Sequence, residues 1–158
     1  MMKNRLLLAA VIVLGTAFSV HVYAHLEKLY WHVWWLDIPM HFFGGVGVGF
    51  LGLWAALVLG LLPLTGRRAD SFGSATISWK DSPHVWSLGC ALVATAIIGL
   101  AWEVLEVFLL AYSGYAIPAG YIPDTTLDLI MDAVGATTAW WIFYRVQWET
   151  WQKVTATS

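Results

Sequence analysis

The sequence predicts an all-α fold, a polytopic transmembrane four-helix bundle with both chain ends on the cytoplasmic side. Three observations predict it. Of the 158 residues, 59% are hydrophobic and 11% are charged, whereas soluble domains are about 45–50% apolar and about 25% charged. Four apolar runs are long enough to cross a bilayer as helices. The lysine and arginine residues flank these runs unevenly, which indicates an orientation.

The four runs form one transmembrane domain, residues 1–158, with no internal repeat and no low-complexity segment. We expect spans at residues 6–24, 36–62, 85–112 and 125–146. A tryptophan-rich link joins the first two spans, and a polar loop at 65–84 joins the second and third. A Gly/Pro turn at 113–124 joins the last two.

Basic residues lie before the first span, in the polar loop and after the last span: Lys3, Arg5, Arg67, Arg68, Lys80, Arg145 and Lys153. The two short links hold one basic residue, Lys28. Because basic segments stay on the cytoplasmic side, the loop 65–84 and both termini are predicted to be cytoplasmic, with the short links outside. The eight basic residues are scattered and the net charge is −2, which excludes a nucleic-acid-binding surface.

The first run has an alternative interpretation as a cleavable signal peptide. A basic start, an apolar stretch and the sequence Val22-Tyr23-Ala24 are typical of such a peptide. The run of about 19 residues is longer than the usual signal core of about 7–15, which favours a membrane span. The orientation of the other three spans is the same in both interpretations.

Six of the ten acidic residues fall in predicted spans or at their ends: Asp37, Glu103, Glu106, Asp124, Asp128 and Asp132. No lysine or arginine lies deep in a span to neutralise them. A carboxylate at the bilayer centre costs about 2.5–3.5 kcal/mol even on insertion scales. A bound cation, shared protons or a water-filled cavity has to offset that cost.

The spacing of these residues predicts that they share one site. The members of each group lie on one helix face, being three or four residues apart: Asp37 with His41, Glu103 with Glu106, and Asp124, Asp128 and Asp132 together. Glycine and alanine continue the same faces, which lets the helices pack closely there. At a rise of 1.5 Å per residue, the deeper groups lie roughly 6–13 Å below the outer face. We therefore expect these side chains to converge in the outer half of the bilayer.

One histidine with several carboxylates suits a divalent metal ion such as Mg, Mn, Ca, Fe or Zn. The expected ligands or acid–base groups are Asp37, His41, Glu103, Glu106, Asp128 and Asp132. A metal-free cluster of shared protons is the alternative. Single members also have simpler roles open to them, with Asp37 and Asp124 as helix N-caps and His41 as a hydrogen-bonded interface residue. His21 and His25 share a face at the outer end of the first span, where we expect an interfacial role.

Three motifs resemble those of the VanZ-like and YjdF-like small bacterial membrane proteins. They are Asp37-x-x-x-His41-Phe42, Trp102-Glu103-x-x-Glu106 and Asp124-Thr125-x-x-Asp128-x-x-x-Asp132-x-x-Gly135. The likeness covers the cores of the last three spans, and Asp132 stands where the VanZ-like pattern has Asn. The resemblance implies a multi-pass protein of the bacterial inner membrane and, for VanZ-like members, a link to glycopeptide-antibiotic resistance. It implies no reaction.

The first functional hypothesis is a small inner-membrane protein with an outward-facing metal site, acting on a lipid-linked or cell-envelope substrate that reaches it from the bilayer. A cation or proton pathway is the second hypothesis. The third is an accessory subunit whose acidic cluster pairs with a basic residue of another protein. Whether the protein is an enzyme, and its oligomeric state, stay open at this stage.

The distribution of lysine and arginine gives a topology prediction. A reporter fused after Ser158 should report a cytoplasmic location, because the basic residues near the last span favour that side. Paired fusions to alkaline phosphatase and to green fluorescent protein measure it. A periplasmic signal from this fusion would reverse the predicted orientation of the site.

Overall fold

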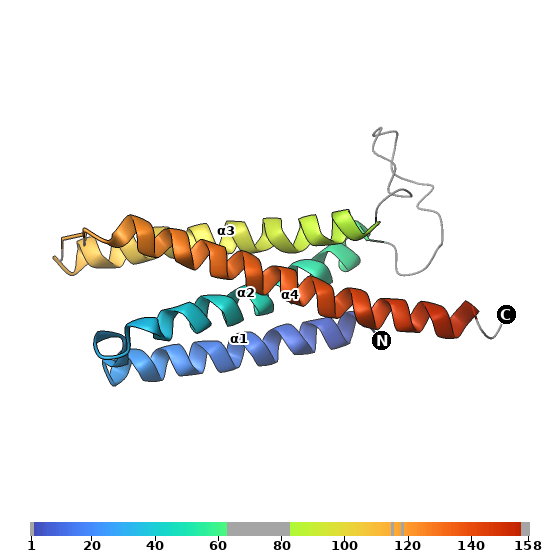
Figure 1. Cartoon of the computed structure of the whole chain (residues 1–158), viewed down its shortest axis with the longest axis horizontal. Helices are drawn as coiled ribbons and strands as arrows, with labels where there is room; N and C mark the ends of the chain where they lie inside the picture. The colour runs from blue at the N-terminus through green and yellow to red at the C-terminus, as the bar shows by residue number, and fades with distance from the viewer. Residues whose placement is uncertain (1, 63–82, 115, 118, 156–158) are drawn as a thin grey trace, which may run out of the picture.

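The structure, a computed structural model, describes residues 2–62, 83–114, 116–117 and 119–155. Four long helices make up most of these residues, and each helix runs antiparallel to the one before it in the sequence (Figure 1). The helices are α1 (Met2–Leu26), α2 (Asp37–Val58), α3 (Pro83–Tyr112) and α4 (Tyr121–Thr155). Two short 3₁₀ turns, η1 (Leu29–Trp31) and η2 (Trp34–Leu36), join α1 to α2. These residues contain no strand, so the predicted all-α fold is confirmed. Most of the predicted loop at 65–84 lies outside the described residues.

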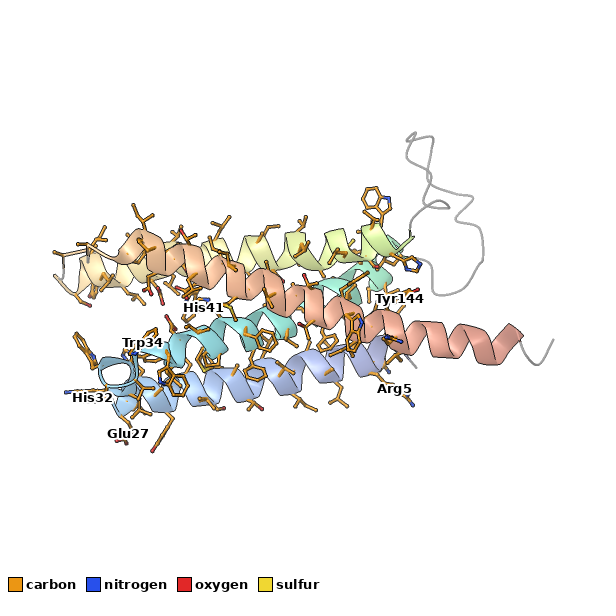
Figure 2. The ribbon with its side chains drawn as sticks, viewed as in Figure 1. Arg5, Glu27, His32, Trp34, His41 and Tyr144 are labelled. Carbon is orange, nitrogen blue, oxygen red and sulfur yellow. The ribbon has the colours of Figure 1, made fainter. Side chains whose placement is uncertain are left out.

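The two ends of the bundle differ in composition. One end carries η1, η2 and the turn between α3 and α4, and we call it the connection end. Glu27, His32 and Trp34 lie there, whereas Arg5 and Tyr144 lie toward the opposite end (Figure 2). The tryptophan-rich link thus lies at one end of the bundle, and Arg5, near the N-terminus, lies at the other.

Three helical segments are long and apolar enough to cross a membrane: Lys3–Leu26, Trp34–Val58 and His84–Tyr112. The predicted fourth span, 125–146, lies inside α4, which does not meet the same criterion. Its first half carries Asp124, Asp128 and Asp132, which lower its hydropathy. α4 is nevertheless part of the bundle, because it packs against both α2 and α3.

Several helix boundaries differ from the predicted spans, and two of these differences have identifiable reasons. α2 ends at Val58 although the apolar run continues to residue 62, because Gly60 adopts a left-handed backbone (φ 73°). The Leu61 N–H then donates to the Ala56 carbonyl and closes the helix. α4 begins at Tyr121, one turn before the predicted start, since a proline such as Pro123 is tolerated in the first turn of a helix.

These boundaries correct the N-cap interpretation of two aspartates. Asp37 is the first residue of α2, and its N-cap position is Leu36, with no side-chain capping bond. Asp124 lies inside the first turn of α4, where its N–H donates to the Gly120 carbonyl. Neither residue is an N-cap. Both still lie where a carboxylate interacts favourably with the helix dipole.

α2 is the central helix and packs against each of the other three. Where it crosses α4, no side chain separates the two backbones. A methyl group on Gly45 would overlap the backbone of Asp132, and one on Gly135 would overlap the backbone carbonyl of Phe42. Small residues permit such close approach between membrane helices, and this crossing fixes the position of the acidic face of α4 on α2.

The close crossing predicts a large difference between two Gly-to-Ala substitutions. Gly45→Ala should destabilise the folded protein by about 1–3 kcal/mol or more, because backbone atoms of Asp132 occupy the space of the new methyl group. Gly15→Ala is the matched control: nothing lies within 4 Å of the new atom, and alanine favours a helix by about 0.5–1 kcal/mol over glycine. Thermal unfolding in detergent measures both effects, and equal melting temperatures would contradict the close packing.

Candidate functional site

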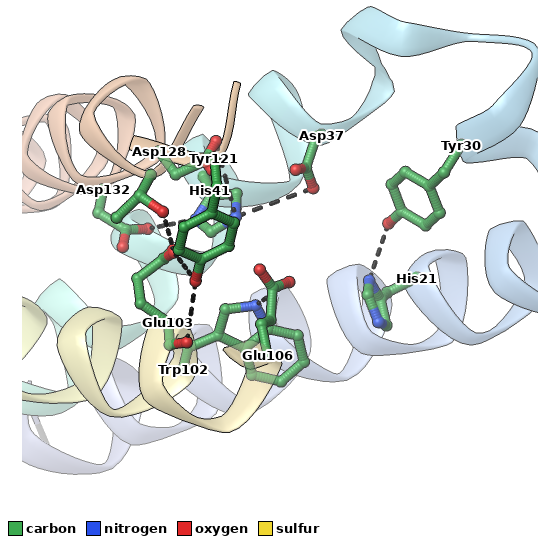
Figure 3. A network of polar contacts seen from close by, with 11 residues as sticks. His21, Tyr30, Asp37, His41, Trp102, Glu103, Glu106, Tyr121, Asp128 and Asp132 are labelled. Carbon is green, nitrogen blue, oxygen red and sulfur yellow. Dashed lines mark hydrogen bonds and ion pairs between the residues drawn. The ribbon is translucent and has the colours of Figure 1, made fainter. Parts of the chain in front are cut away.

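His41 lies at the centre of the candidate site, one turn into α2, and its side chain is buried. Its two ring nitrogens face different carboxylates (Figure 3). The Nε2 atom lies 3.8 Å from Asp37 Oδ1 and 3.8 Å from Asp128 Oδ1. The Nδ1 atom lies 3.5 Å from Asp132 Oδ1. Two residues of α4 and one of α2 thus surround a single imidazole.

The Nε2 side of this arrangement can hold a metal ion. One ligand atom from each of Asp37, His41 and Asp128 lies within 4.8 Å of the other two. Metal–ligand bonds to nitrogen and oxygen are roughly 2.0–2.6 Å long, so two ligands on opposite sides of one ion are about 4.0–5.2 Å apart. The three atoms are therefore near enough to share one ion.

Asp132 occupies the other side of the ring, in space that a glycine of α3 leaves open. A methyl group on Gly99 of α3 would collide with Asp132 Oδ2. A carboxylate that faces Nδ1 favours the tautomer with its proton on Nδ1, which leaves the lone pair on Nε2. That lone pair is then directed toward Asp37 and Asp128.

Glu103 of α3 is buried beside this group and interacts with the first turns of α4. The Thr125 hydroxyl donates to Glu103 Oε2 (2.8 Å). The Tyr121 hydroxyl is 3.3 Å from the same oxygen and 3.1 Å from the Glu103 carbonyl. The second oxygen, Oε1, is buried without a hydrogen-bond partner among the described residues. One oxygen of this carboxylate thus accepts hydrogen bonds, and the other accepts none from the described residues.

A second set of polar contacts lies nearer the connection end, between α1, η1 and α3. Glu106 Oε1 accepts a hydrogen bond from Trp102 Nε1 (3.0 Å). Tyr30 and His21 Nδ1 are 2.8 Å apart, and the His21 ring packs edge-on against Trp102. Burial, followed by the charge of Asp37, raises the pKa of Tyr30 to about 12, so the phenol of this pair keeps its proton at neutral pH.

The six predicted site residues fall into two groups. Asp37, His41 and Asp128 form the potential metal-binding group. Asp132, Glu103 and Glu106 lie around it with contacts of their own. The side chains thus gather near one end of the bundle, and neither Glu103 nor Asp132 faces outward.

Sequence reasoning missed the residues that support these carboxylates. Thr125 stands inside one of the quoted motifs, one turn before Asp128 on the same face, and that spacing was a usable signal. Tyr121 was assigned to the preceding turn. η1 brings Tyr30 next to His21, and a three-residue 3₁₀ turn has no hydropathy periodicity by which the sequence could predict it.

The described part of the chain contains no ion pair between a carboxylate and a lysine or arginine. The carboxylates found there within 4 Å of a basic side chain are the three around the His41 imidazole. A buried cluster of several carboxylates around one imidazole is therefore short of positive charge, and a bound cation is one way to supply it.

The hydrogen bond from Thr125 predicts a stability difference between two adjacent threonines. Thr125→Val should cost about 1–3 kcal/mol, because it removes a donor from the buried carboxylate of Glu103. Thr126→Val should be close to neutral, since the Thr126 hydroxyl donates to the carbonyl of Ile122 on an exposed face. Thermal unfolding in detergent compares them. Equal effects would show that the Glu103 contact contributes nothing to the fold.

Comparison with protein families matches residues 2–149 to a family described as "Predicted membrane protein (DUF2238)". No curated protein and no solved structure matches the sequence. The family match covers nearly the whole chain and agrees with the three apolar helices. It supports a membrane protein, without supporting the VanZ-like group in particular. The chain belongs to the DUF2238 family of predicted membrane proteins.

Proposed function

We propose that this protein binds a divalent metal ion through Asp37, His41 and Asp128. The observation that carries the proposal is the group of three ligand atoms around His41 Nε2. The distribution of lysine and arginine supports an orientation in which the connection end faces outward. The site then lies in the outer half of a bacterial inner membrane.

The donor set determines which ions fit. One imidazole nitrogen with two carboxylates suits borderline or hard ions such as Zn²⁺, Mn²⁺ or Fe²⁺. Three protein ligands leave room for a water molecule or a substrate oxygen, which is typical of reactive metal sites and not of structural ones. When bound, such an ion polarises a substrate oxygen or activates water.

The charges around the ligands favour the same ion. Asp37 and Asp128 together balance a charge of +2, while Asp132 and Glu103 lie just outside the ligand group. In the low dielectric of a helix bundle, several like charges repel strongly unless a cation lies between them. An ion at His41 Nε2 would lie between the carboxylates of Asp37 and Asp128.

A cation or proton pathway has less support. Such a pathway needs polar groups through the whole thickness of the bundle. Beyond His41, toward the opposite end, the described core is mainly apolar, with residues such as Val46, Phe50 and Leu53. Its buried polar side chains there are the hydroxyls of Ser87 and Thr95, and no buried ionisable group among the described residues continues the path. For the substrate we favour a cell-envelope molecule carried in the membrane, to which the VanZ-like resemblance also points.

Metal removal tests the proposal. The purified protein should contain close to one equivalent of a divalent metal by elemental mass spectrometry. A chelator should lower its melting temperature in detergent and metal should restore it, because an ion at about 100 times its dissociation constant stabilises the fold by about 2.7 kcal/mol. Asp128→Ala should abolish both the bound metal and the response. Asp124→Ala, on an exposed face one turn earlier in α4, should retain them.

The role of Asp132 gives a second, graded readout. Asp132→Asn should weaken metal affinity by about 10–100-fold without removing a ligand, because the carboxylate that orients the imidazole is lost. Titration of the chelator-treated protein with Zn²⁺ or Mn²⁺ measures this change. Metal-free protein that is indifferent to chelator and does not take up either ion would overturn the proposal.

A further inference from the structure

A cavity of about 190 Å³ lies beside the His41 group, between α1, α2 and α3. Each of these helices lines it with a stretch of about two or three turns: residues 14–21 of α1, 37–48 of α2 and 95–102 of α3. From α4, Asp132 contributes to the wall. The cavity is therefore a lengthwise space in the bundle, and its long dimension follows the helix axes.

The cavity has a polar end and an apolar end. His21, His41 and Asp132 lie at the end nearer the connections, and Leu14 and Val48 lie at the other. Seven residues separate His21 from Leu14, and seven separate His41 from Val48, which corresponds to about 10 Å along each helix. The polar groups thus stand above a mainly apolar channel that runs deeper into the membrane.

The cavity opens sideways between α1 and α3. Phe18 of α1 and Ile98 of α3 both line it and are also largely exposed on the outside of the bundle. The two helices come together at the polar end, where His21 packs against Trp102. Below that contact, both sides of the opening belong to candidate membrane spans. At that depth the surrounding medium is lipid hydrocarbon.

We infer that this cavity binds a hydrocarbon chain of a membrane lipid, which enters between α1 and α3 and brings its polar part to His21, His41 and Asp132. An apolar cavity of about 150 Å³ binds benzene, so 190 Å³ accepts a segment of one chain and not a whole lipid. One part of the inference, that the bound lipid is a substrate of the metal site, rests on the proposed function. Chain binding itself requires no ion.

Thr95 distinguishes hydrocarbon from a polar occupant. Its hydroxyl is buried in the cavity wall without a hydrogen-bond partner among the described residues. Other threonines in these helices, such as Thr126 and Thr137, donate to the carbonyl four residues earlier. A hydrocarbon chain makes no use of the Thr95 hydroxyl, so chain binding does not require it.

Photolabelling from a lipid chain tests the inference. Chelator-treated protein is placed in nanodiscs of phosphatidylcholine and phosphatidylglycerol that contain phosphatidylcholine with a diazirine on one acyl chain, and labelled residues are mapped by mass spectrometry. Val48 and Val46 are the matched pair, because both are buried (8% and 7% exposed) and Val48 alone lines the cavity. Label is expected on Val48 and not on Val46.

Filling the cavity should remove that label. Ala17→Phe places an aromatic ring in the cavity from α1 and should abolish labelling of Val48. If the phenylalanine variant does not fold, Ala17→Leu replaces it and should reduce the labelling of Val48 in part. Ile12→Phe, on an exposed part of α1 outside the cavity, should leave the label unchanged. Thr95→Val should also preserve it. Folding of each variant is checked by monodisperse elution and by its melting temperature.

Three results would overturn the inference. Val48 could be labelled no more than Val46 in folded protein, or its label could persist in Ala17→Phe and Ala17→Leu. Protection of Ile98 while its neighbour Ile97 is labelled would show that another copy of the chain covers the opening instead of lipid. Because the ion is absent throughout, none of these results depends on whether the metal site exists, and metal titration of the same sample tests that site separately.

Discussion

The direct contact between the backbones of α2 and α4 is the constraint on which the rest of the structure depends. Gly45 lies on the backbone of Asp132, and Gly135 lies on the backbone of Phe42. With no side chain between them, the two helices have one rotation and one register available at this crossing. That register places Asp132 beside one nitrogen of His41 and Asp128, one turn away, beside the other. The packing of this helix pair therefore determines the geometry of the site.

The hydrogen bonding of the site is incomplete among the described residues. A structural polar cluster would be expected to satisfy each of its groups. Here Glu103 has one oxygen satisfied by Thr125 and the other left without a partner among the described residues. The His41 ring has carboxylates on both of its nitrogens. This excess of acceptors over donors is what an incoming cation or proton can use.

The sequence predicts the architecture well because bilayer thickness and hydropathy leave few alternatives. It also predicts which helix faces carry the carboxylates, since the spacing of Asp128 from Asp132 and of Asp37 from His41 is a local property. It does not predict which carboxylate faces which nitrogen of His41. That depends on the rotation and register of α4 against α2, which the close contacts at Gly45 and Gly135 determine. The pairing of Tyr30 with His21 is likewise beyond sequence, since two 3₁₀ turns create it. The apolar pattern misplaces the end of α2, because Gly60 stops the helix inside an apolar run. It also misplaces the start of α4, because the first turn of that helix lies in the segment with Pro123 that reads as a turn.

The acidic first half of α4 has a consequence for how the protein reaches its folded state. A helix with three aspartates on one face is a poor substrate for insertion into a bilayer by itself, at about 2.5–3.5 kcal/mol for each charge at the membrane centre. Asp128 and Asp132 contact the His41 imidazole only when α2 lies beside α4. α1, α2 and α3 are apolar enough to enter alone. Biogenesis therefore has a built-in order, in which α1, α2 and α3 enter the membrane first and α4 enters by docking onto them.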